Sequence, residues 1–265
     1  MPLARLLDLD RYPLDRLNST AGRPLVARCR DDLQRTGMFN LAGLIRAEQV
    51  PRAVAELKPV LDNKAFVHKR EHNIYFRKDV PGLAPDHPAL KPVTTVNHTI
   101  CADQMPADAV VLQIYEWPAM ATFLAATMGK TELHTMADPL ARVNVMAYRE
   151  GEALNWHFDR SEFTTTLLLQ AAEAGGAFEY RTDLRTDSDP NYDGVARLLA
   201  GEDPAVRIEP LAAGTLNVFR GKNTAHRVTP VRGRLERIVA VFSYYERPGV
   251  LFTAEERIGF YGRAA

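Results

Sequence analysis

The second half of the chain consists of short runs of β-forming residues that are separated by turn residues. Between residues 141 and 245 the runs are, in order, "ARVNVMAY", "EALNWHFD", "FTTTLLLQ", "GGAFEY", "VRIEPL", "GTLNVFRG", "HRVTPV" and "RIVAVFSYY". Many short strands at this spacing are typical of a sandwich or barrel such as a jelly roll. The sequence therefore predicts a mainly β fold with a jelly-roll, cupin-like core and helical additions.

The first half of the chain has a different pattern. Residues 25–60 carry apolar residues at spacings of three and four, interrupted by glycine and proline, which predicts two or three short helices. A strand pattern begins near Lys64, prolines mark 80–92 as a loop, and 106–129 has a helical pattern. We expect a single domain with these parts: an N-terminal helical segment and the first strands in 1–100, the jelly-roll core in 101–265, and a polar insertion around 183–205.

Composition limits the partners that the chain can attract. Lys and Arg total 33, as do Asp and Glu, so the formal net charge is zero and no global field draws nucleic acid or an anionic membrane. No stretch approaches the roughly 20 apolar residues that a membrane span needs, and the N-terminal residues lack the apolar region of a signal peptide. The two cysteines, Cys29 and Cys101, lie far apart, which favours a reducing compartment. We expect a cytoplasmic protein whose partner is a small molecule.

The stretch "NWHFDRSEF", residues 155–163, places two metal-capable side chains one residue apart. Successive side chains of a strand point to opposite faces, so His157 and Asp159 lie on one face and Phe158 lies on the other. Taken alone, such a pair is more typical of a solvated strand than of a metal site.

A second histidine changes this interpretation. The run "GTLNVFRGKNTAHRVTPV" contains a turn glycine, an apolar strand, a short loop and then His226 at the start of another strand, so its imidazole can approach the first pair. Two histidines and one carboxylate form the facial triad of non-haem Fe(II) oxygenases, which leaves positions open for a co-substrate such as 2-oxoglutarate and for O2. A zinc hydrolase with the same ligands needs only one open position, so the triad alone leaves the metal undecided.

An arginine favours the co-substrate. The distal carboxylate of 2-oxoglutarate needs a cation, and a guanidinium offers a bidentate fork that lysine lacks. Arg237 begins the apolar strand that follows the His226 strand and is the first candidate, with Arg234 in reserve. Arg227 and Arg232 are expected to be exposed charges at a turn or a strand edge.

With these residues in this order, residues 141–245 resemble the Fe(II)/2-oxoglutarate-dependent oxygenases of the double-stranded β-helix superfamily. The motifs that carry the resemblance are "NVMAYREGEALNWHFD", "GGAFEY", "GTLNVFRG" and "HRVTPVRGRLERIVAVFSY". Over the whole chain, "REHNIYF", "HFDRSEFTTTLLLQ" and the terminal "FYGR" are similar to the family of free-lysine radical halogenases and their hydroxylase relatives. In the halogenases a glycine replaces the metal carboxylate, and chloride binds in its place. Because Asp159 occupies that position here, the resemblance implies a hydroxylase.

The resemblance also implies a reaction and a set of roles. The enzyme would hydroxylate an unactivated C–H bond of a small polar substrate, a free amino acid or a derivative, while 2-oxoglutarate and O2 are consumed and succinate is formed. Arg237 would bind 2-oxoglutarate. Asn144 and Tyr148, which share a face of the preceding strand, would hydrogen-bond the co-substrate or substrate, or would be satisfied polar groups of the core. The Fe(II) ligands would be His157, Asp159 and His226.

Substrate contacts are expected near the metal pair and in the earlier strand, although each residue is also compatible with a structural role. Two other functions stay open: oxidation of a carrier-bound or protein-linked residue, and ligand binding by a non-catalytic jelly roll. Loss of a metal ligand or of the arginine would favour the second, and neither is lost. The candidates for a substrate carboxylate or the pocket wall are Arg160, Glu162, Asn155, Trp156, Arg70 and His72.

The remaining histidines offer one competing site. "HKREH" places His68 and His72 four residues apart, which is the spacing of the HExxH zinc motif on a helix. The glutamate that this motif requires is absent, and the surrounding apolar residues favour a strand, so a zinc hydrolase is disfavoured here. His87, His98 and His134 are expected at the surface or behind the site.

Overall fold

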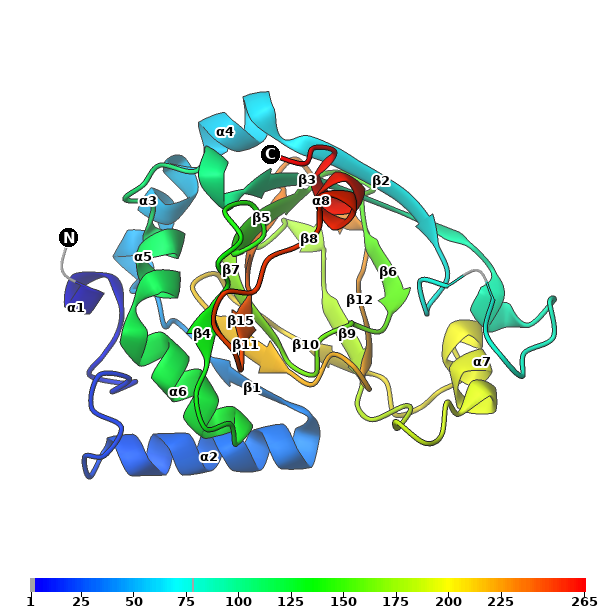
Figure 1. Cartoon of the computed structure of the whole chain (residues 1–265), viewed down its shortest axis with the longest axis horizontal. Helices are drawn as coiled ribbons and strands as arrows, with labels where there is room; N and C mark the ends of the chain where they lie inside the picture. Colours follow the sequence, from blue (N-terminus) through cyan, green and yellow to red (C-terminus); the bar gives the residue numbers. More distant parts are fainter. Residues whose placement is uncertain (1–2, 78) are drawn as a thin grey trace.

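The computed structural model describes residues 3–77 and 79–265, and its main feature is a seven-stranded antiparallel sheet (Figure 1). The strands lie in the order β1-β11-β7-β14-β5-β3-β2, so neighbours in the sheet are mostly distant in the sequence. The main sheet is built from β1 (Met38–Leu41), β2 (Phe66–His72), β3 (Val93–Cys101), β5 (Val143–Tyr148), β7 (Thr164–Gln170), β11 (Leu216–Phe219) and β14 (Arg237–Phe242).

A second, four-stranded antiparallel sheet has the order β10-β9-β12-β6 and packs against one face of the main sheet. Two facing antiparallel sheets of this kind form a jelly roll. The mainly β fold with helices that the strand pattern predicted is therefore confirmed. The second sheet consists of β6 (Leu154–His157), β9 (Phe178–Arg181), β10 (Arg207–Glu209) and β12 (Ala225–Val228), and the two short pairs are β8 (Ala174–Gly175) with β13 (Val231–Arg232) and β4 (His134–Thr135) with β15 (Tyr244–Tyr245).

The helices between residues 3 and 128 cover the outer face of the main sheet, on the side away from the second sheet (Figure 1). Within the described residues, none of the helices is both long and apolar enough to cross a membrane. The α-helices are α1 (Leu3–Leu6), α2 (Gly22–Thr36), α3 (Val50–Ala55), α4 (Lys58–Lys64), α5 (Val110–Glu116), α6 (Pro118–Met128), α7 (Tyr192–Ala200) and α8 (Ala254–Tyr261), and the short 3-10 helices are Ala47–Gln49, Pro88–Leu90 and Ala102–Gln104.

The strands of the main sheet separate an apolar outer face from an inner face that carries polar groups. On β14, Ile238, Ala240 and Phe242 belong to the core that the helices complete. Alternation along the strand turns Arg237 and Val239 to the inner face, between the two sheets. This face provides the walls of the interior in which the predicted metal ligands lie.

One strand lies where the sequence predicts helix. Helix α2 ends at Gly37, whose φ of 79° is the left-handed conformation that glycine adopts readily, and β1 follows at once. The strand pairs with β11, with Met38 opposite Phe219. The prediction of helices over 25–60 is therefore wrong for Met38–Leu41, because this strand depends on a partner that is distant in the sequence.

Candidate metal centre

The two predicted histidine ligands come from neighbouring strands of the second sheet. His157 is the last residue of β6, and His226 lies directly opposite it on β12. Paired residues of antiparallel strands present their side chains on the same face, and the two imidazole centroids are 4.1 Å apart. Only 5% of His157 and 3% of His226 is exposed. The strand register thus brings together residues that are far apart in the chain.

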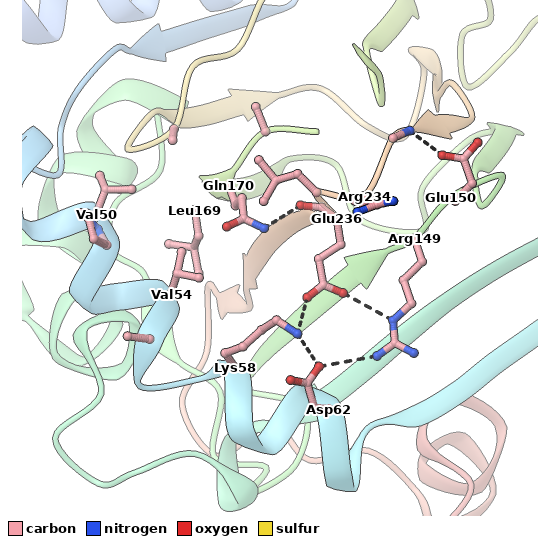
Figure 2. Close-up of a pocket in the computed structure, with 16 residues that line it drawn as sticks. Val50, Val54, Lys58, Asp62, Arg149, Glu150, Leu169, Gln170, Arg234 and Glu236 are labelled. Carbon is pink, nitrogen blue, oxygen red and sulfur yellow. Dashed lines mark hydrogen bonds and ion pairs between the residues drawn. The ribbon is translucent and has the colours of Figure 1, made fainter. Parts of the chain in front are cut away.

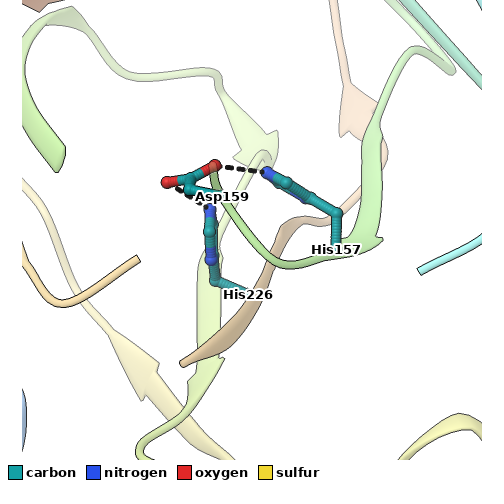
Figure 3. Close-up of side chains that lie close together, drawn as sticks. All are labelled: His157, Asp159 and His226. Carbon is teal, nitrogen blue, oxygen red and sulfur yellow. Dashed lines mark ion pairs between the residues drawn. The ribbon is translucent and has the colours of Figure 1, made fainter. Parts of the chain in front are cut away.

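Asp159 completes the group two residues after β6 (Figure 3). Its Oδ1 lies 3.3 Å from Nε2 of His157, and its Oδ2 lies 3.4 Å from Nε2 of His226. One ligand atom from each residue falls within 4.8 Å of the other two. In the described part of the chain, no other group of three or more acidic, histidine or cysteine side chains could hold a metal ion.

The hydrogen bonds behind the imidazoles show that a cation fits between these atoms. Nδ1 of His157 lies 2.8 Å from the carbonyl oxygen of Asn155, and Nδ1 of His226 lies 3.0 Å from that of Thr224. A carbonyl can only accept, so each Nδ1 carries the hydrogen and each Nε2 of a neutral ring presents a lone pair. When both rings are neutral, these lone pairs face carboxylate oxygens, which are also acceptors. A metal ion among the three groups turns this repulsive contact into coordination.

The electrostatics of the triad are those of a carboxylate that attracts positive charge. Burial would lower the pKa of His226, but Asp159 outweighs it and raises that pKa. Burial would raise the pKa of Asp159, but His226 and His157 outweigh it and hold that pKa well below the usual range. Burial is the main cause that lowers the pKa of His157, and the neighbouring His226 lowers it further. An ionised carboxylate beside a neutral imidazole is the form in which these side chains bind metals.

Aromatic residues enclose the triad. Phe219 and Phe178 lie beside His226, with ring centroids 4.8 Å and 5.8 Å from its own. On the other side, the Phe76 centroid lies 5.6 Å from that of His157. Phe76 has a φ of 54°, which is rare for an aromatic residue and costs backbone energy that the surroundings must offset. These rings limit the access of water to the triad.

Arg237 projects from the inner face of β14 and is buried, with 4% of its surface exposed. It lies opposite Tyr148 of β5, and its guanidinium carbon is 5.9 Å from the centre of that ring. Among the described residues no carboxylate lies within ion-pair distance of it, and burial lowers its pKa. Arg237 also lines a cavity of about 240 Å³ together with Phe178. A buried guanidinium without an acidic partner is a site for an anion.

The glycine pair of "GGAFEY" makes room for this arginine. A Cβ at Gly176 would lie 3.2 Å from Cδ of Arg237, and one at Gly175 would lie 2.0 Å from the carbonyl oxygen of Pro230. Both glycines have φ near 60°. The backbone therefore passes close to the arginine stem, which larger residues would prevent.

The polar residues predicted on β5 have different surroundings. Both ends of the Asn144 amide are occupied, because its Oδ1 accepts from the Tyr261 hydroxyl at 2.9 Å and its Nδ2 donates to the Leu140 carbonyl at 3.1 Å. The Tyr148 side chain is fully buried, and its hydroxyl lies 3.8 Å from Sδ of Met146. Tyr148 is therefore next to Arg237, whereas Asn144 holds the C-terminal helix α8.

The strand "KREH" brings two of the predicted substrate residues toward the triad. His72 lies 6.5 Å from His157, measured between ring centroids, and its Nε2 is 2.8 Å from Oγ1 of Thr95. The guanidinium carbon of Arg70 lies 4.8 Å from the centre of the Phe76 ring, which itself contacts His157. In the part of the chain that the structure describes, no acidic group pairs with Arg70.

The other four predicted substrate residues have partners of their own. Asn155 donates to the Thr94 carbonyl at 2.7 Å, and Trp156 lies on the opposite face of β6 in an apolar cluster with α7. Two charged side chains are largely exposed and ion-paired, Arg160 with Glu256 at 2.8 Å and Glu162 with Lys130 at 2.7 Å.

The competing histidines do not form a second metal group in the described chain. "HKREH" lies on β2, so His68 and His72 share a face but are about 13 Å apart along the strand. His87 accepts a hydrogen bond from the Ala89 amide, and His98 and His134 lie beside Glu152 and Glu132. As for the arginines, Arg232 and Arg234 are exposed and Arg227 pairs with Glu179.

Two neighbours of Asp159 were not predicted. The Thr164 hydroxyl donates to Oδ2 of Asp159, and the amide of Asp159 donates to the carbonyl of Gly221 at 3.0 Å. Both residues lie within quoted motifs, "HFDRSEFTTTLLLQ" and "GTLNVFRG". No sequence signal distinguishes them from other threonines and turn glycines, because their contacts join separate parts of the fold.

A larger hollow than the one beside Arg237 lies elsewhere (Figure 2). It measures about 1290 Å³ and is lined by α3, α4 and the end of β7. Its charged groups bind one another: Glu236 pairs with Lys58 at 3.0 Å and with Arg149 at 3.3 Å. Because Leu169 in its wall belongs to the core on the helical side of the main sheet, this hollow opens on the outer face and not at the triad.

Comparison with known families assigns the chain. The model of the Halogenase D family matches residues 22–250, which is most of the sequence. The chain belongs to the Halogenase D family. None of the curated proteins matches it.

This member of the Halogenase D family is similar in fold to solved iron oxygenases. A 2OG-Fe(II) oxygenase family protein from Burkholderia pseudomallei matches with a TM-score of 0.53 and 16% identity over 85% of this chain and 92% of that chain. The α-ketoglutarate-dependent epimerase SnoN from nogalamycin biosynthesis matches with a TM-score of 0.56 and 13% identity over 84% and 83%. A Pseudomonas putida prolyl-4-hydroxylase gives 0.51 and 16% over 83% and 99%.

A further structure of SnoN, in complex with Fe3+ and α-ketoglutarate, matches with a TM-score of 0.51 and 15% identity over 85% of this chain and 87% of that chain. Family, fold and triad together confirm the predicted class: an oxygenase that uses iron and 2-oxoglutarate with O2.

Proposed function

We propose that this Halogenase D family member hydroxylates an unactivated C–H bond of a small polar substrate, a free amino acid or a derivative. The observation that carries the proposal is the group of two buried histidines, His157 and His226, and the half-buried Asp159, in which both Nε2 atoms face one carboxylate. These three residues would hold Fe(II), which, when bound, activates O2 as 2-oxoglutarate is decarboxylated to succinate.

Asp159 favours hydroxylation over halogenation. Its carboxylate lies between the two imidazoles and supplies the third protein ligand from the chain itself. In the resembled halogenases, chloride takes this position because a glycine leaves it open. With the carboxylate in place, no coordination position is left over for a halide once 2-oxoglutarate and O2 are bound.

Arg237 is the residue that we assign to the distal carboxylate of 2-oxoglutarate. It is buried on the inner face without an acidic partner among the described residues, and a carboxylate would neutralise it through two parallel hydrogen bonds. Tyr148 lies against it and fixes one side of its position. Arg234, the alternative, is exposed at the turn before β14 and lines the hollow on the outer face of the main sheet, away from the triad.

Arg70 is the residue that we assign to an anionic group of the substrate. It is half-buried, it lacks an acidic partner in the described chain, and it stacks on Phe76 next to His157. An α-carboxylate is the anionic group common to amino acids, and a guanidinium binds it in a fixed orientation. His72, on the same face of β2, would complete this wall. Orienting the substrate C–H bond and excluding water are then the tasks of the protein.

The test is formation of succinate from 2-oxoglutarate with Fe(II) and ascorbate, against a panel of free amino acids, with mass spectrometry of each mixture. The proposal expects substrate-dependent succinate and a product heavier by one oxygen atom. Asp159→Ala should abolish both, whereas Asp31→Ala, which removes an exposed carboxylate of α2, should leave both unchanged. Full activity of Asp159→Ala would refute the triad.

The same mixtures separate the alternatives. A chlorinated product in the presence of chloride would refute the assignment to hydroxylation. If no amino acid stimulates succinate although Fe(II) and 2-oxoglutarate bind, a free amino acid is not the substrate, and a carrier-bound or protein-linked residue takes its place. Absence of bound 2-oxoglutarate would instead favour a non-catalytic jelly roll.

A further inference from the structure

The two oxygens of the Asp159 carboxylate have different neighbours. Oδ1 faces Nε2 of His157 at 3.3 Å. Oδ2 faces Nε2 of His226 at 3.4 Å and also accepts the hydroxyl hydrogen of Thr164. A hydrogen bond to one oxygen withdraws one of its lone pairs and fixes the rotation of the whole carboxylate. Oδ1 is thus the oxygen that stays available to a metal.

Thr164 can hold the carboxylate because it belongs to the other sheet. It is the first residue of β7, in the main sheet, and lies opposite Phe219 of β11. Asp159 follows β6 of the second sheet. The hydrogen bond therefore ties the residue after β6 to the more extensive sheet of the jelly roll.

Gly221 closes the space behind the carboxylate. Its carbonyl accepts the amide of Asp159, and a Cβ at this position would lie 2.3 Å from Oδ2 of Asp159 and 2.7 Å from Oγ1 of Thr164. Real Cβ atoms do not approach other atoms so closely, so only glycine allows the turn after β11 to pack here. Glycine is needed here for the space that it leaves and not for its backbone freedom, because the φ of Gly221 is not positive.

We propose that Thr164 and Gly221 are positioning residues that make Asp159 a ligand through one oxygen only. The proposal rests on the proposed function. If iron is bound, two imidazoles and one carboxylate oxygen would leave three coordination positions for 2-oxoglutarate and O2. A carboxylate that rotates and binds through both oxygens takes one of those positions. Thr164 opposes this by fixing the rotation of the carboxylate through Oδ2, and Gly221 lets the turn pack behind it.

The experiment compares Thr164→Val, which removes the hydroxyl at nearly constant shape, with Thr164→Ser, which keeps it. Thr165→Val is the control, because it makes the same change at the next residue, which is buried but points to the opposite face of β7. Co(II) is titrated into each metal-free protein, and its visible absorption spectrum is recorded before and after addition of 2-oxoglutarate. These readouts do not depend on turnover.

We expect Thr164→Val to weaken Co(II) binding by about 10- to 100-fold and to alter the spectrum, as is typical when a group behind a metal ligand is removed. Thr164→Ser should remain within a few-fold of the wild type, and Thr165→Val should match it. Gly221→Ala should weaken Co(II) binding as Thr164→Val does.

Wild-type affinity and spectrum in Thr164→Val would overturn the positioning role while leaving the triad intact. A triad that does not bind metal gives a different result, since Asp159→Ala would then bind Co(II) as the wild type does. If Thr164→Val fails to fold, loss of the wild-type spectrum in Thr164→Ser would equally refute the role of the hydroxyl.

Discussion

Replacing Arg237 with methionine should have opposite effects on stability and on co-substrate binding. Methionine keeps an unbranched stem and fills irregular space, so the change removes the charge with little loss of packing. The wild-type protein without 2-oxoglutarate holds a guanidinium that is 4% exposed and that faces no carboxylate within ion-pair distance in the described chain. Such a group lowers the free energy of unfolding, because its desolvation is not compensated.

The magnitudes follow from these contacts. Removing an unpaired buried polar group should raise the free energy of unfolding of the 2-oxoglutarate-free protein by about 1–3 kcal/mol. Loss of a charge-assisted contact of about 1.5–3 kcal/mol should weaken 2-oxoglutarate binding by roughly 10- to 150-fold. At a concentration of 100 times the wild-type Kd, the ligand stabilises the wild type by about 2.7 kcal/mol, whereas a variant with 100-fold weaker binding gains only about 0.4 kcal/mol.

The assay is urea unfolding with and without 2-oxoglutarate, with Co(II) present in every sample. Arg234→Met is the matched control, because it removes an exposed arginine three residues earlier and should change neither value. The reasoning is refuted if 2-oxoglutarate raises the free energy of unfolding of Arg237→Met by as much as it does for the wild type. If this increase is lost in Arg234→Met instead, Arg234 is the residue that binds 2-oxoglutarate.

Two further predictions concern stability away from Arg237. Asp138 accepts from the amides of Ala141 and Phe252 and from Arg257; burial alone would raise its pKa, but these partners lower it. The stability that the ionised Asp138 contributes is therefore present above the unfolded pKa of about 3.9 and is lost as the pH falls through the folded pKa. In urea unfolding, Asp138→Asn should have a lower free energy of unfolding at pH 7, and that free energy should fall less steeply in acid than it does in the wild type. Asn217 is 1% exposed and neither end of its amide has a partner in the described chain, so Asn217→Leu should raise the unfolding free energy by about 1–2 kcal/mol, and a decrease would mean that the amide binds an ordered ligand or water.

The local sequence pattern was sufficient to predict most strands of the core. The runs around β5, β7, β11 and β14 alternate between an apolar outer face and a mixed inner face, so their strand character is visible in the sequence itself. The edge strand Met38–Leu41 was missed for the opposite reason. Its four residues carry no alternation of their own and become a strand only against Leu216–Phe219.

Residue types and strand order were enough to predict the three metal-ligand candidates of the site. The spacing predicted that His157 and Asp159 share a strand face, although β6 ends at His157 and Asp159 follows it by two residues. His226 was expected to approach them because it opens a strand, and its pairing with His157 brings the rings together. Thr164 and Gly221 could not be predicted, because each contact joins segments whose separation depends on how the two sheets pack. Arg160 shows the converse: it follows Asp159 in the sequence, yet its guanidinium binds Glu256 of α8.

The surroundings of Asp159 indicate what kind of group this position requires. Thr164 donates a hydrogen bond into it, and the Nε2 atoms of His157 and His226 face it across a space that a cation fits. A donor on one side and a metal on the other both favour an anion, whether the chain or the solvent supplies it. In this member of the Halogenase D family the chain supplies it, as a carboxylate tied to both sheets. If the proposed function holds, the choice between hydroxylation and halogenation depends on one side chain, Asp159, while the hydrogen-bond donor Thr164 belongs to the scaffold.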